Sequence, residues 1–492
     1  MMEFEFNNEY NQARARLQEW DSDDDPGNPR NWSPLRKNLT TVVICLIGFA
    51  TTVNASMYSS GHEQVQEAFG VSTTVSLLPL SAYSLGLAFG PMISSPLSET
   101  FGRKFVYLLT LPMVDLFTIG VGASQGIASL IICRFIAGLF AAPGVSVAAA
   151  TITDYTHPSQ RIIPLGIYYT IPSIGSSMGP LIGAFAVEHQ GWRWTAWVPL
   201  IMAAVLHPPA LFIRESYKPI LPRKRAEKLI GDGDGILPFQ RKGAIQLFKE
   251  FITSTIVRPL HMLTTEPLVG FICLYCGFQF ALLYTFVVAS PRVFASVYNF
   301  SASGQGLSFL GMVAGCIISP IILFTVDRFV RTHPNLRIRN NNTESTPTTP
   351  AENIIYAPEN RLYTAMFGSL ILPIGLFTFA WTSRATIHWI VPILAQGITF
   401  LGSLLIYISC NFYMLDIYGS KYGASASGAS SLTRYALSTA FPLFVPQMYD
   451  SLGVGWASSL LGFVALAMAP IPWWFFYRGP VLRGRSGYEH GT

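Results

Sequence analysis

The sequence predicts an all-α membrane protein with twelve transmembrane helices in two six-helix bundles. Half of the 492 residues are hydrophobic and only 12% are charged, whereas a soluble globular protein has about 25% charged residues. Runs of mostly apolar residues that are long enough to cross about 30 Å of hydrocarbon as a helix occur twelve times. A long polar connection separates the first six runs from the last six.

The twelve runs define the expected spans. In the first half of the chain they cover 38–60, 76–98, 104–123, 127–153, 162–186 and 193–213. In the second half they cover 267–290, 304–326, 362–382, 386–411, 424–449 and 453–477. The run at 424–449 is the least apolar of these. All six cysteines lie inside apolar runs and are too few for a disulfide framework, so we interpret them as small core residues.

The distribution of lysine and arginine predicts the orientation. With the amino terminus inside the cell, 27 of the 32 basic residues fall in cytoplasmic segments, and the external loops hold only Arg193, Arg292 and Arg384. Cytoplasmic loops near span ends retain positive charge, so both termini are predicted to be cytoplasmic. The first 37 residues are polar and acidic, so no cleavable signal peptide is expected. Without obvious sorting signals, we favour the plasma membrane over the vacuolar membrane.

These features divide the chain into five expected parts. They are a cytoplasmic tail (1–37), an N-terminal bundle (38–214), a basic cytoplasmic linker (215–266), a C-terminal bundle (267–477) and a second tail (478–492). The linker contains Pro222-Arg223-Lys224-Arg225, which we interpret as a basic segment beside anionic headgroups rather than a nucleic-acid site. A polar stretch at 335–358 is expected to be a flexible cytoplasmic loop.

A very short loop follows the second span and carries an acid and two bases, a chemistry that clamps two helices together. It resembles the loop motif of the major facilitator superfamily, although Ser95 and Thr100 replace a glycine and an arginine of that motif. The matching positions are Glu99, Gly102, Arg103 and Lys104. The resemblance implies a charge relay with Asp154 at the end of the fourth span, which locks one conformation and breaks during transport. The alternative is an ordinary loop ion pair.

Arg134 lies inside the fourth span, where a guanidinium costs at least about 2.5 kcal/mol unless it faces the bundle interior or a polar cavity. Gly138 shares its helix face, and the segment resembles the superfamily's arginine motif. The resemblance implies a role in proton coupling, and an interhelical hydrogen-bond anchor is the alternative. Asp115 is the only carboxylate deep in a span and is the second candidate for proton coupling. We expect that it is not the sole proton carrier.

The fifth span carries a ladder of glycines. Its members are Gly166, Gly175, Gly179, Pro180 and Gly183, with Ala184 at the end. Glycines four residues apart form one smooth face for close helix packing, and a proline lets the helix bend. The full spacing resembles the antiporter motif of drug-exporting facilitators, with Ala184 in place of the last glycine. The resemblance favours export over uptake.

Three further segments are similar to fungal members of the twelve-span drug:proton antiporter branch. They are 24–33, Pro358-Glu359-Asn360-Arg361-Leu362 and Trp192-Arg193-Trp194. The resemblance covers about residues 20–480 and implies the major facilitator fold and a fungal source.

In that fold the first, fourth, seventh and tenth spans line a central cavity with the substrate near the midplane. Polar or aromatic residues at that depth are Asn54, Arg134, Gln279, Tyr284, Tyr407 and Asn411, with Tyr168, Tyr169 and Tyr435 as a second group. A polycation needs carboxylates in a low-dielectric site. Their near absence from the spans favours neutral or weakly acidic, partly aromatic cargo.

We therefore predict a proton-coupled secondary transporter that exports amphipathic organic molecules, such as a drug, toxin or secondary metabolite, by alternating access. A polyamine or nutrient transporter of the same fold, and a sensor that binds without transport, are the alternatives. The expected partners are a small organic substrate, protons and the lipid bilayer, with no nucleic acid and a monomeric chain.

No enzymatic activity, cofactor or metal is expected. The sequence has no phosphate-binding Walker loop, its histidines lack ligand spacing, and the pair Cys273 and Cys276 lies in an apolar span. The sequon at Asn299 falls in an external loop and is a candidate for glycosylation, whereas the sequon at Asn341 is predicted to be cytoplasmic and unmodified.

Overall fold

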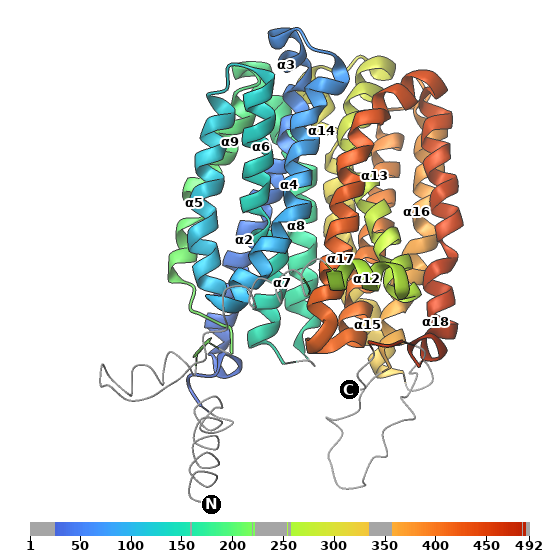
Figure 1. Cartoon of the computed structure of the whole chain (residues 1–492). Helices are drawn as coiled ribbons and strands as arrows, with labels where there is room; N and C mark the ends of the chain where they lie inside the picture. The colour runs from blue at the N-terminus through green and yellow to red at the C-terminus, as the bar shows by residue number, and fades with distance from the viewer. Residues whose placement is uncertain are drawn as a thin grey trace, which may run out of the picture.

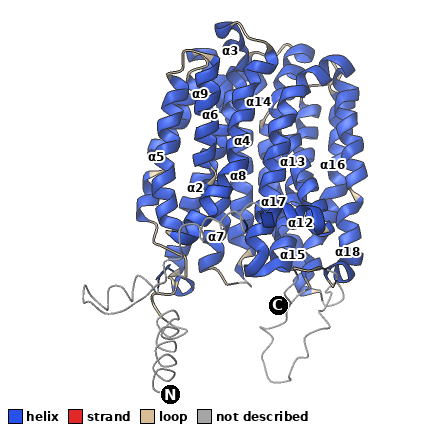
Figure 2. Cartoon of the chain, viewed as in Figure 1, coloured by secondary structure: helices blue, strands red, loops and turns tan. Residues whose placement is uncertain are grey.

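The computed structural model describes residues 25–157, 160–218, 220–221, 253, 257–333, 357–484 and 486–488. Within these ranges the chain is helical and contains no strand (Figure 2), which confirms the predicted all-α class. The linker cluster at 222–225, the polar stretch at 335–356 and most of the N-terminal tail lie outside the described residues.

The first half of the chain forms six spans. They are α2 (Pro34–Met57) continued by η2 (Tyr58–Gly61) and α3 (His62–Phe69), α4 (Thr73–Thr100), α5 (Arg103–Gly122), α6 (Ile127–Ala141) with α7 (Pro143–Tyr155), α8 (Ile162–Gln190), and α9 (Trp194–Leu206) with η4 (Pro208–Phe212). Serines begin two of these helices, because the hydroxyls of Ser33 and Ser72 accept hydrogen bonds from backbone N–H groups that have no partner within the helix. Pro143 stands at the first position of α7, where the missing N–H costs nothing.

The second half begins with a short helix and continues with long ones. Its elements are α12 (Arg258–Thr265), α13 (Pro267–Tyr298), α14 (Ala302–Leu307), α15 (Leu310–Thr332), η8 (Pro358–Arg361), α16 (Leu362–Thr382), α17 (Ile390–Met468) and α18 (Pro470–Arg483). A straight helix as long as α17, with 79 residues, would extend about 120 Å at 1.5 Å per residue. Its backbone is non-helical at Gly419 and Gly453, both with positive φ, so α17 comprises three helical segments.

Eleven segments in the described part are long and apolar enough to cross a membrane. The last of them, Ser425–Arg483, has 59 residues and is interrupted at Gly453. It therefore contains both the eleventh and the twelfth expected spans. One boundary differs from the prediction, because α13 continues to Tyr298. Arg292 thus belongs to this helix rather than to an external loop, and its guanidinium lies 3.8 Å from the carboxylate of Asp450.

The helices gather in two groups that lie side by side (Figure 1). Helices α2 to α9 form one group and α13 to α18 form the other. Helices α3 and α14 lie at one end of the molecule, and α7 and α18 lie toward the opposite end. Helix α8 packs against α2 within its own group and also contacts α14 and α15 of the other group. The exact limits of the five expected parts stay predictions.

Candidate functional site

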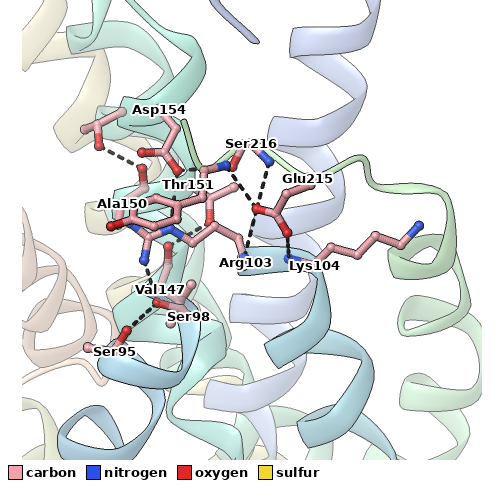
Figure 3. Close-up of polar contacts among 12 residues, drawn as sticks. Ser95, Ser98, Arg103, Lys104, Val147, Ala150, Thr151, Asp154, Glu215 and Ser216 are labelled. Carbon is pink, nitrogen blue, oxygen red and sulfur yellow. Dashed lines mark hydrogen bonds and ion pairs between the residues drawn. The ribbon is translucent and has the colours of Figure 1, made fainter. Parts of the chain in front are cut away.

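Four segments meet where α5 begins (Figure 3). Arg103 donates from Nε to Asp154 Oδ2 at 3.3 Å, near the end of α7, and from Nη1 to the hydroxyl of Ser98 in α4. The hydroxyl of Ser216, in the segment after η4, donates to the same carboxylate oxygen at 3.1 Å. The structure thus brings together Arg103 and Asp154, the two residues of the expected relay, and the gating role of this pair stays a prediction.

Glu215 is a member of this cluster that the sequence analysis missed. Its carboxylate accepts from the backbone N–H of Arg103 at 2.9 Å and from that of Lys104 at 3.1 Å. It therefore caps the first turn of α5, where the helix dipole favours negative charge. Gly102 has φ of +102°, and a Cβ at this position would collide with the carboxylate. The sequence offered one signal for this residue, because Glu215 is an acid directly after the sixth span and the loop with Gly102 is a short turn that an acid can cap.

The two other loop residues of the motif take different places. Lys104 Nζ donates to the carbonyl of Leu211 at 2.9 Å. Glu99 is exposed and forms no ion pair within the part of the chain that the structure describes. The pKa of Tyr217 is raised by burial and, to a smaller extent, by the charge of Glu99. The ring of Tyr217 lies 4.6 Å from the guanidinium of Arg103.

A second charged cluster lies at the same end of the C-terminal group. Arg361, directly before α16, donates from Nε to Asp416 Oδ2 at 2.8 Å and from Nη1 to Asp327 Oδ1 at 3.1 Å. Close to it, Arg483 Nη2 lies 3.1 Å from Glu359 Oε1. The sequence analysis quoted the segment with Arg361 but assigned it no partners. Each half of the chain therefore joins its helices at this end through an arginine and carboxylates.

Arg134 is 1% exposed and is held by neutral groups. Its Nη1 donates to the backbone carbonyl of Asn54 at 2.7 Å and to Oδ1 of the same residue at 3.2 Å. The rings of Tyr58 and Tyr83 lie 4.8 and 5.2 Å from the guanidinium. Asn54 in turn donates from Nδ2 to the hydroxyl of Thr118 at 3.1 Å. This geometry is compatible with both roles that the sequence left open for Arg134.

Asp115 is paired with a residue that the sequence analysis did not select. Its Oδ2 lies 3.1 Å from Nδ1 of His207, at the end of α9. Both side chains border a small cavity within the N-terminal group. The cavity is lined by Ala50, Thr51, Asn54, Leu111, Val114, Asp115, Thr118, Pro199, Leu200, Ala203 and His207. The carboxylate–imidazole pair and Asn54, which holds Arg134, therefore share one internal space.

The glycine ladder of α8 faces two different helices. A Cβ on Gly175 would lie 2.8 Å from the carbonyl oxygen of Phe49, and one on Gly179 would lie 2.9 Å from the backbone nitrogen of Met57, so both glycines admit α2. A Cβ on Gly166 would instead lie 2.9 Å from the ring of Phe324 in α15. Gly166 and Gly175 are nine residues apart, which is about two and a half helical turns. The two glycines therefore lie on opposite faces of α8.

The end of the ladder also contributes to two contacts. A Cβ on Gly183 would lie 2.8 Å from the carbonyl oxygen of Met57, again in α2. The carbonyl of Pro180 accepts a hydrogen bond from the hydroxyl of Ser60 at 3.0 Å. Ala184, which departs from the motif, contacts α14. A Cβ on Gly306 of α14 would lie 2.7 Å from the Cβ of Ala184.

A small central cavity lies in the second group of helices at its contact with α8. It is lined by Ser173 of α8 and by Gln279, Phe280, Leu283, Cys316, Phe400, Ser403, Leu404 and Tyr407 of the second half. Gln279 and Tyr407 therefore line this cavity, and their role in substrate binding stays a prediction. Tyr284 is buried elsewhere in α13, and Asn411 donates from Nδ2 to the carbonyl of Tyr407 at 2.7 Å. The lining carries no charged side chain.

The two groups of helices touch on both sides of this cavity. Toward the end with α7 and α18, the ring of Tyr169 contacts Tyr407 and Phe412 at centroid distances of 5.6 and 6.0 Å. Toward the end with α3 and α14, the N–H of Ser303 donates to Glu188 Oε2 at 2.9 Å. The two groups of helices are therefore in contact toward both ends of the molecule.

The remaining expected features lie apart from the cavity. Asn299 is exposed and ends α13 in the left-handed conformation with φ of +55°. Tyr168 donates its hydroxyl to the carbonyl of Val145 at 2.6 Å. Cys273 and Cys276 are buried free thiols. Among the described residues, no group of three or more histidine, cysteine, aspartate or glutamate side chains could hold a metal ion.

Residues 44–442 match the sequence pattern of the Major Facilitator Superfamily. The chain belongs to the major facilitator superfamily. It is therefore a multi-pass membrane transporter of small molecules and not an enzyme. The fold agrees with this assignment, because the chain is similar to a solved structure of the proton:xylose symporter XylE bound to 6-bromo-6-deoxy-D-glucose. The TM-score is 0.64 at 14% identity, over 90% of this chain and 97% of that one.

Fungal members of the superfamily are similar over nearly the whole chain. The Saccharomyces cerevisiae protein named polyamine transporter 4 is 37% identical, over 96% of this chain and 73% of its own length. The ascochitine biosynthesis cluster MFS transporter of Didymella fabae is 33% identical, over 96% and 89%. The cycloheximide resistance protein of Candida maltosa is 32% identical, over 96% and 85%. The names of these relatives refer to different compounds, namely polyamines, ascochitine and cycloheximide.

Proposed function

We propose that this facilitator is a proton-coupled exporter of amphipathic organic small molecules and works by alternating access of its two bundles. The central cavity carries this proposal, because its lining combines aromatic rings, apolar groups and a few hydroxyl and amide groups without a charged side chain. A pocket of this kind binds an apolar ligand body and orients it through a few polar contacts. The relatives named for cycloheximide resistance and for a biosynthesis cluster support this cargo class.

The packing of α8 supports the direction of transport. Gly175 and Gly179 allow α2 and α8 to approach to backbone contact, so the motif that resembles that of exporters has a structural use in this chain. The ion pair between Arg103 and Asp154 supports alternating access. It joins α5 to α7, and its opening would free that end of the N-terminal bundle.

Proton coupling is assigned to Asp115 and Arg134, with His207 added from the structure. Ionisable residues inside membrane segments mark proton pathways when they face one another or an internal cavity. Asp115 and His207 satisfy both conditions. Asn54 lies at the same cavity and holds Arg134, so a change of charge on the pair acts on the arginine across a short distance in a low dielectric.

Polyamine export is the second candidate, favoured by the 37% identity to polyamine transporter 4. A polyamine carries several positive charges, and each needs a carboxylate or equivalent group when it leaves water. The absence of carboxylates from the cavity lining makes an amphipathic cargo the better fit. We further propose a monomer in the plasma membrane, which a fluorescent fusion and native mass spectrometry would test.

Purified full-length protein in proteoliposomes tests these proposals. With an acidic interior, accumulation of radiolabelled cycloheximide is expected, and it should disappear when nigericin collapses the pH gradient. Labelled spermidine, tested in parallel, should remain outside. Flux that is unchanged without the gradient would contradict proton coupling. Binding of cycloheximide without any gradient-dependent flux would instead support a sensor, and spermidine uptake would support the polyamine assignment. Protein-free vesicles serve as the control.

A further inference from the structure

Arg434 is a second buried arginine, and nothing in the proposed mechanism uses it. It lies in the segment of α17 between Gly419 and Gly453 and is 5% exposed. Its Nη1 donates to the hydroxyl of Tyr407, and its Nη2 donates to the hydroxyl of Ser431 at 3.2 Å. Its Nε has no partner within the described ranges. Both observed acceptors are therefore neutral.

Three aromatic rings surround this guanidinium. The ring centroids of Phe280, Tyr435 and Tyr407 lie 4.6, 4.9 and 5.3 Å from it. Phe280 and Tyr407 also line the central cavity. The cation therefore lies directly behind two residues of the cavity wall.

Two of the other buried arginines have anionic acceptors, whereas Arg134, like Arg434, has only neutral acceptors and keeps Nε and Nη2 without a partner within the described ranges. Arg103 and Arg361 are paired with carboxylates, and Arg134 is held by two oxygens of Asn54. Arg434 forms no ion pair among the residues that the structure describes. Hydroxyl groups and ring faces offset only part of the cost of removing a guanidinium from water. The site therefore provides a positive charge and an unused N–H without an anion to match them.

We propose that Arg434 recognises the anionic group of the cargo, and that the preferred cargo class is an aromatic weak acid in its ionised form. This inference rests on the proposed function, because it takes the central cavity as the cargo site. The aromatic part of the cargo lies against Phe280 and Tyr407, as the composition of the wall favours. Its carboxylate replaces the Tyr407 hydroxyl on the guanidinium, whose planar donors match two carboxylate oxygens. The same charge repels a polyamine.

Equilibrium binding to the purified full-length protein in detergent tests this proposal. The probes are 1-naphthylacetate and its neutral amide, 1-naphthylacetamide, which share the same ring system. The wild-type protein is expected to bind the acid at least about tenfold more tightly than the amide. Arg434→Gln should remove this preference and leave the affinity for the amide within about twofold. Arg434→Lys should retain part of it, because a point charge keeps the attraction and loses the two-pronged geometry.

A matched control is Arg384→Gln, because Arg384 lies over the ring of Trp381 in a loop outside the cavity. This variant should keep the full preference for the acid. If Arg434→Gln does not fold, the wild-type protein still decides the matter. Its affinity for the acid should fall toward that of the amide when the pH is lowered until the probe is neutral. Equal affinities for the two probes, or a preference that survives in folded Arg434→Gln, would overturn the proposal.

The failure of this inference is distinguishable from that of the proposed function. Gradient-driven flux of cycloheximide tests proton-coupled export and does not involve an anionic cargo. Binding of the acid and amide tests Arg434 and does not require flux. Active transport with equal binding would therefore refute the role of Arg434 alone, whereas selective binding without gradient-driven flux would refute the coupled export alone.

Discussion

His207 Nδ1 and Asp115 Oδ2 lie 3.1 Å apart although 92 positions separate the two residues in the chain. The contact joins α9 to α5 inside the membrane-spanning part of the N-terminal group. A carboxylate and an imidazole at this distance can share a proton or carry opposite charges, so the pair can take up a proton in more than one way. The sequence pattern indicated no lysine or arginine partner for Asp115, because the partner is a histidine.

We expect Asp115→Asn to lower proton-driven transport and not to abolish it, because His207 remains able to take up a proton. The double variant Asp115→Asn/His207→Gln should lose gradient-driven flux and keep downhill flux. Proteoliposome flux with and without a pH gradient measures both. Asp450→Asn is the control, since this exposed acid lies outside the pair. Complete uncoupling by Asp115→Asn alone would identify Asp115 as the sole carrier and contradict this prediction.

Asp154→Asn should open the cytoplasmic side of the protein. The variant leaves Arg103 without its anionic partner and weakens the link between α5 and α7, so the inward-open population should rise about fivefold or more. Ser173→Cys, combined with Cys316→Ser to remove the native thiol of the same lining, places a reporter thiol at the central cavity. Its labelling rate by an impermeant maleimide from the cytoplasmic side reports the opening. Asp450→Asn serves as the control, because this exposed acid lies outside the cluster around Arg103. An unchanged labelling rate in Asp154→Asn would refute the gating role.

Glu215→Gln should destabilise the folded protein by about 1 kcal/mol, because the amide retains only one acceptor oxygen for the two N–H groups at the start of α5 and loses the favourable charge. Thermal unfolding of the purified variant measures this change. Glu99→Gln provides the comparison, since an exposed side chain without an ion pair in the described part should alter stability by less than about 0.5 kcal/mol. Equal effects of the two substitutions would show that capping by Glu215 contributes little.

Gly179→Ala should destabilise the protein by about 1–3 kcal/mol, because the new methyl group would lie 2.9 Å from Met57 N and 3.0 Å from Val53 O in α2. Gly423→Ala is a matched control within α17. Its nearest atom would be Leu415 Cδ1 at 3.6 Å, so alanine should be neutral or stabilise the helix by about 0.5–1 kcal/mol. Unfolding midpoints in detergent compare the two variants. A neutral Gly179→Ala would show that the helices have room to separate.

Asn299 should carry a glycan when the full chain is made in a eukaryotic host. Its side chain is exposed, and the residue directly follows the last turn of α13. Endoglycosidase treatment should therefore increase the electrophoretic mobility of the wild-type protein. Asn299→Gly removes the acceptor and suits the positive φ, so this variant should fold normally and show no mobility change. A wild-type chain that endoglycosidase leaves unchanged would contradict the prediction.

The sequence was sufficient for the spans and for the contact between Arg103 and Asp154. The length of the hydrophobic runs predicts the spans, and the resemblance to a known loop motif predicted the contact between Arg103 and Asp154. Glu215 and His207 were not found, because each acts on a residue far away in the chain and neither stands in a recognised pattern. Asn54 was selected as a cavity residue by depth alone. Depth does not tell which way a side chain points, and Asn54 in fact holds Arg134 within its own bundle.

The two faces of α8 make two different kinds of contact, one within its own bundle and one with the other bundle. Gly175 and Gly179 admit α2 to backbone distance, whereas Gly166, half a revolution away, admits Phe324 of the other group. The first contact need not change when the bundles move relative to each other, and the second must slide or part. Substitutions along the α2 face should therefore alter how much protein reaches the membrane. Substitutions at Gly166 should alter the number of transport cycles that each molecule completes per second.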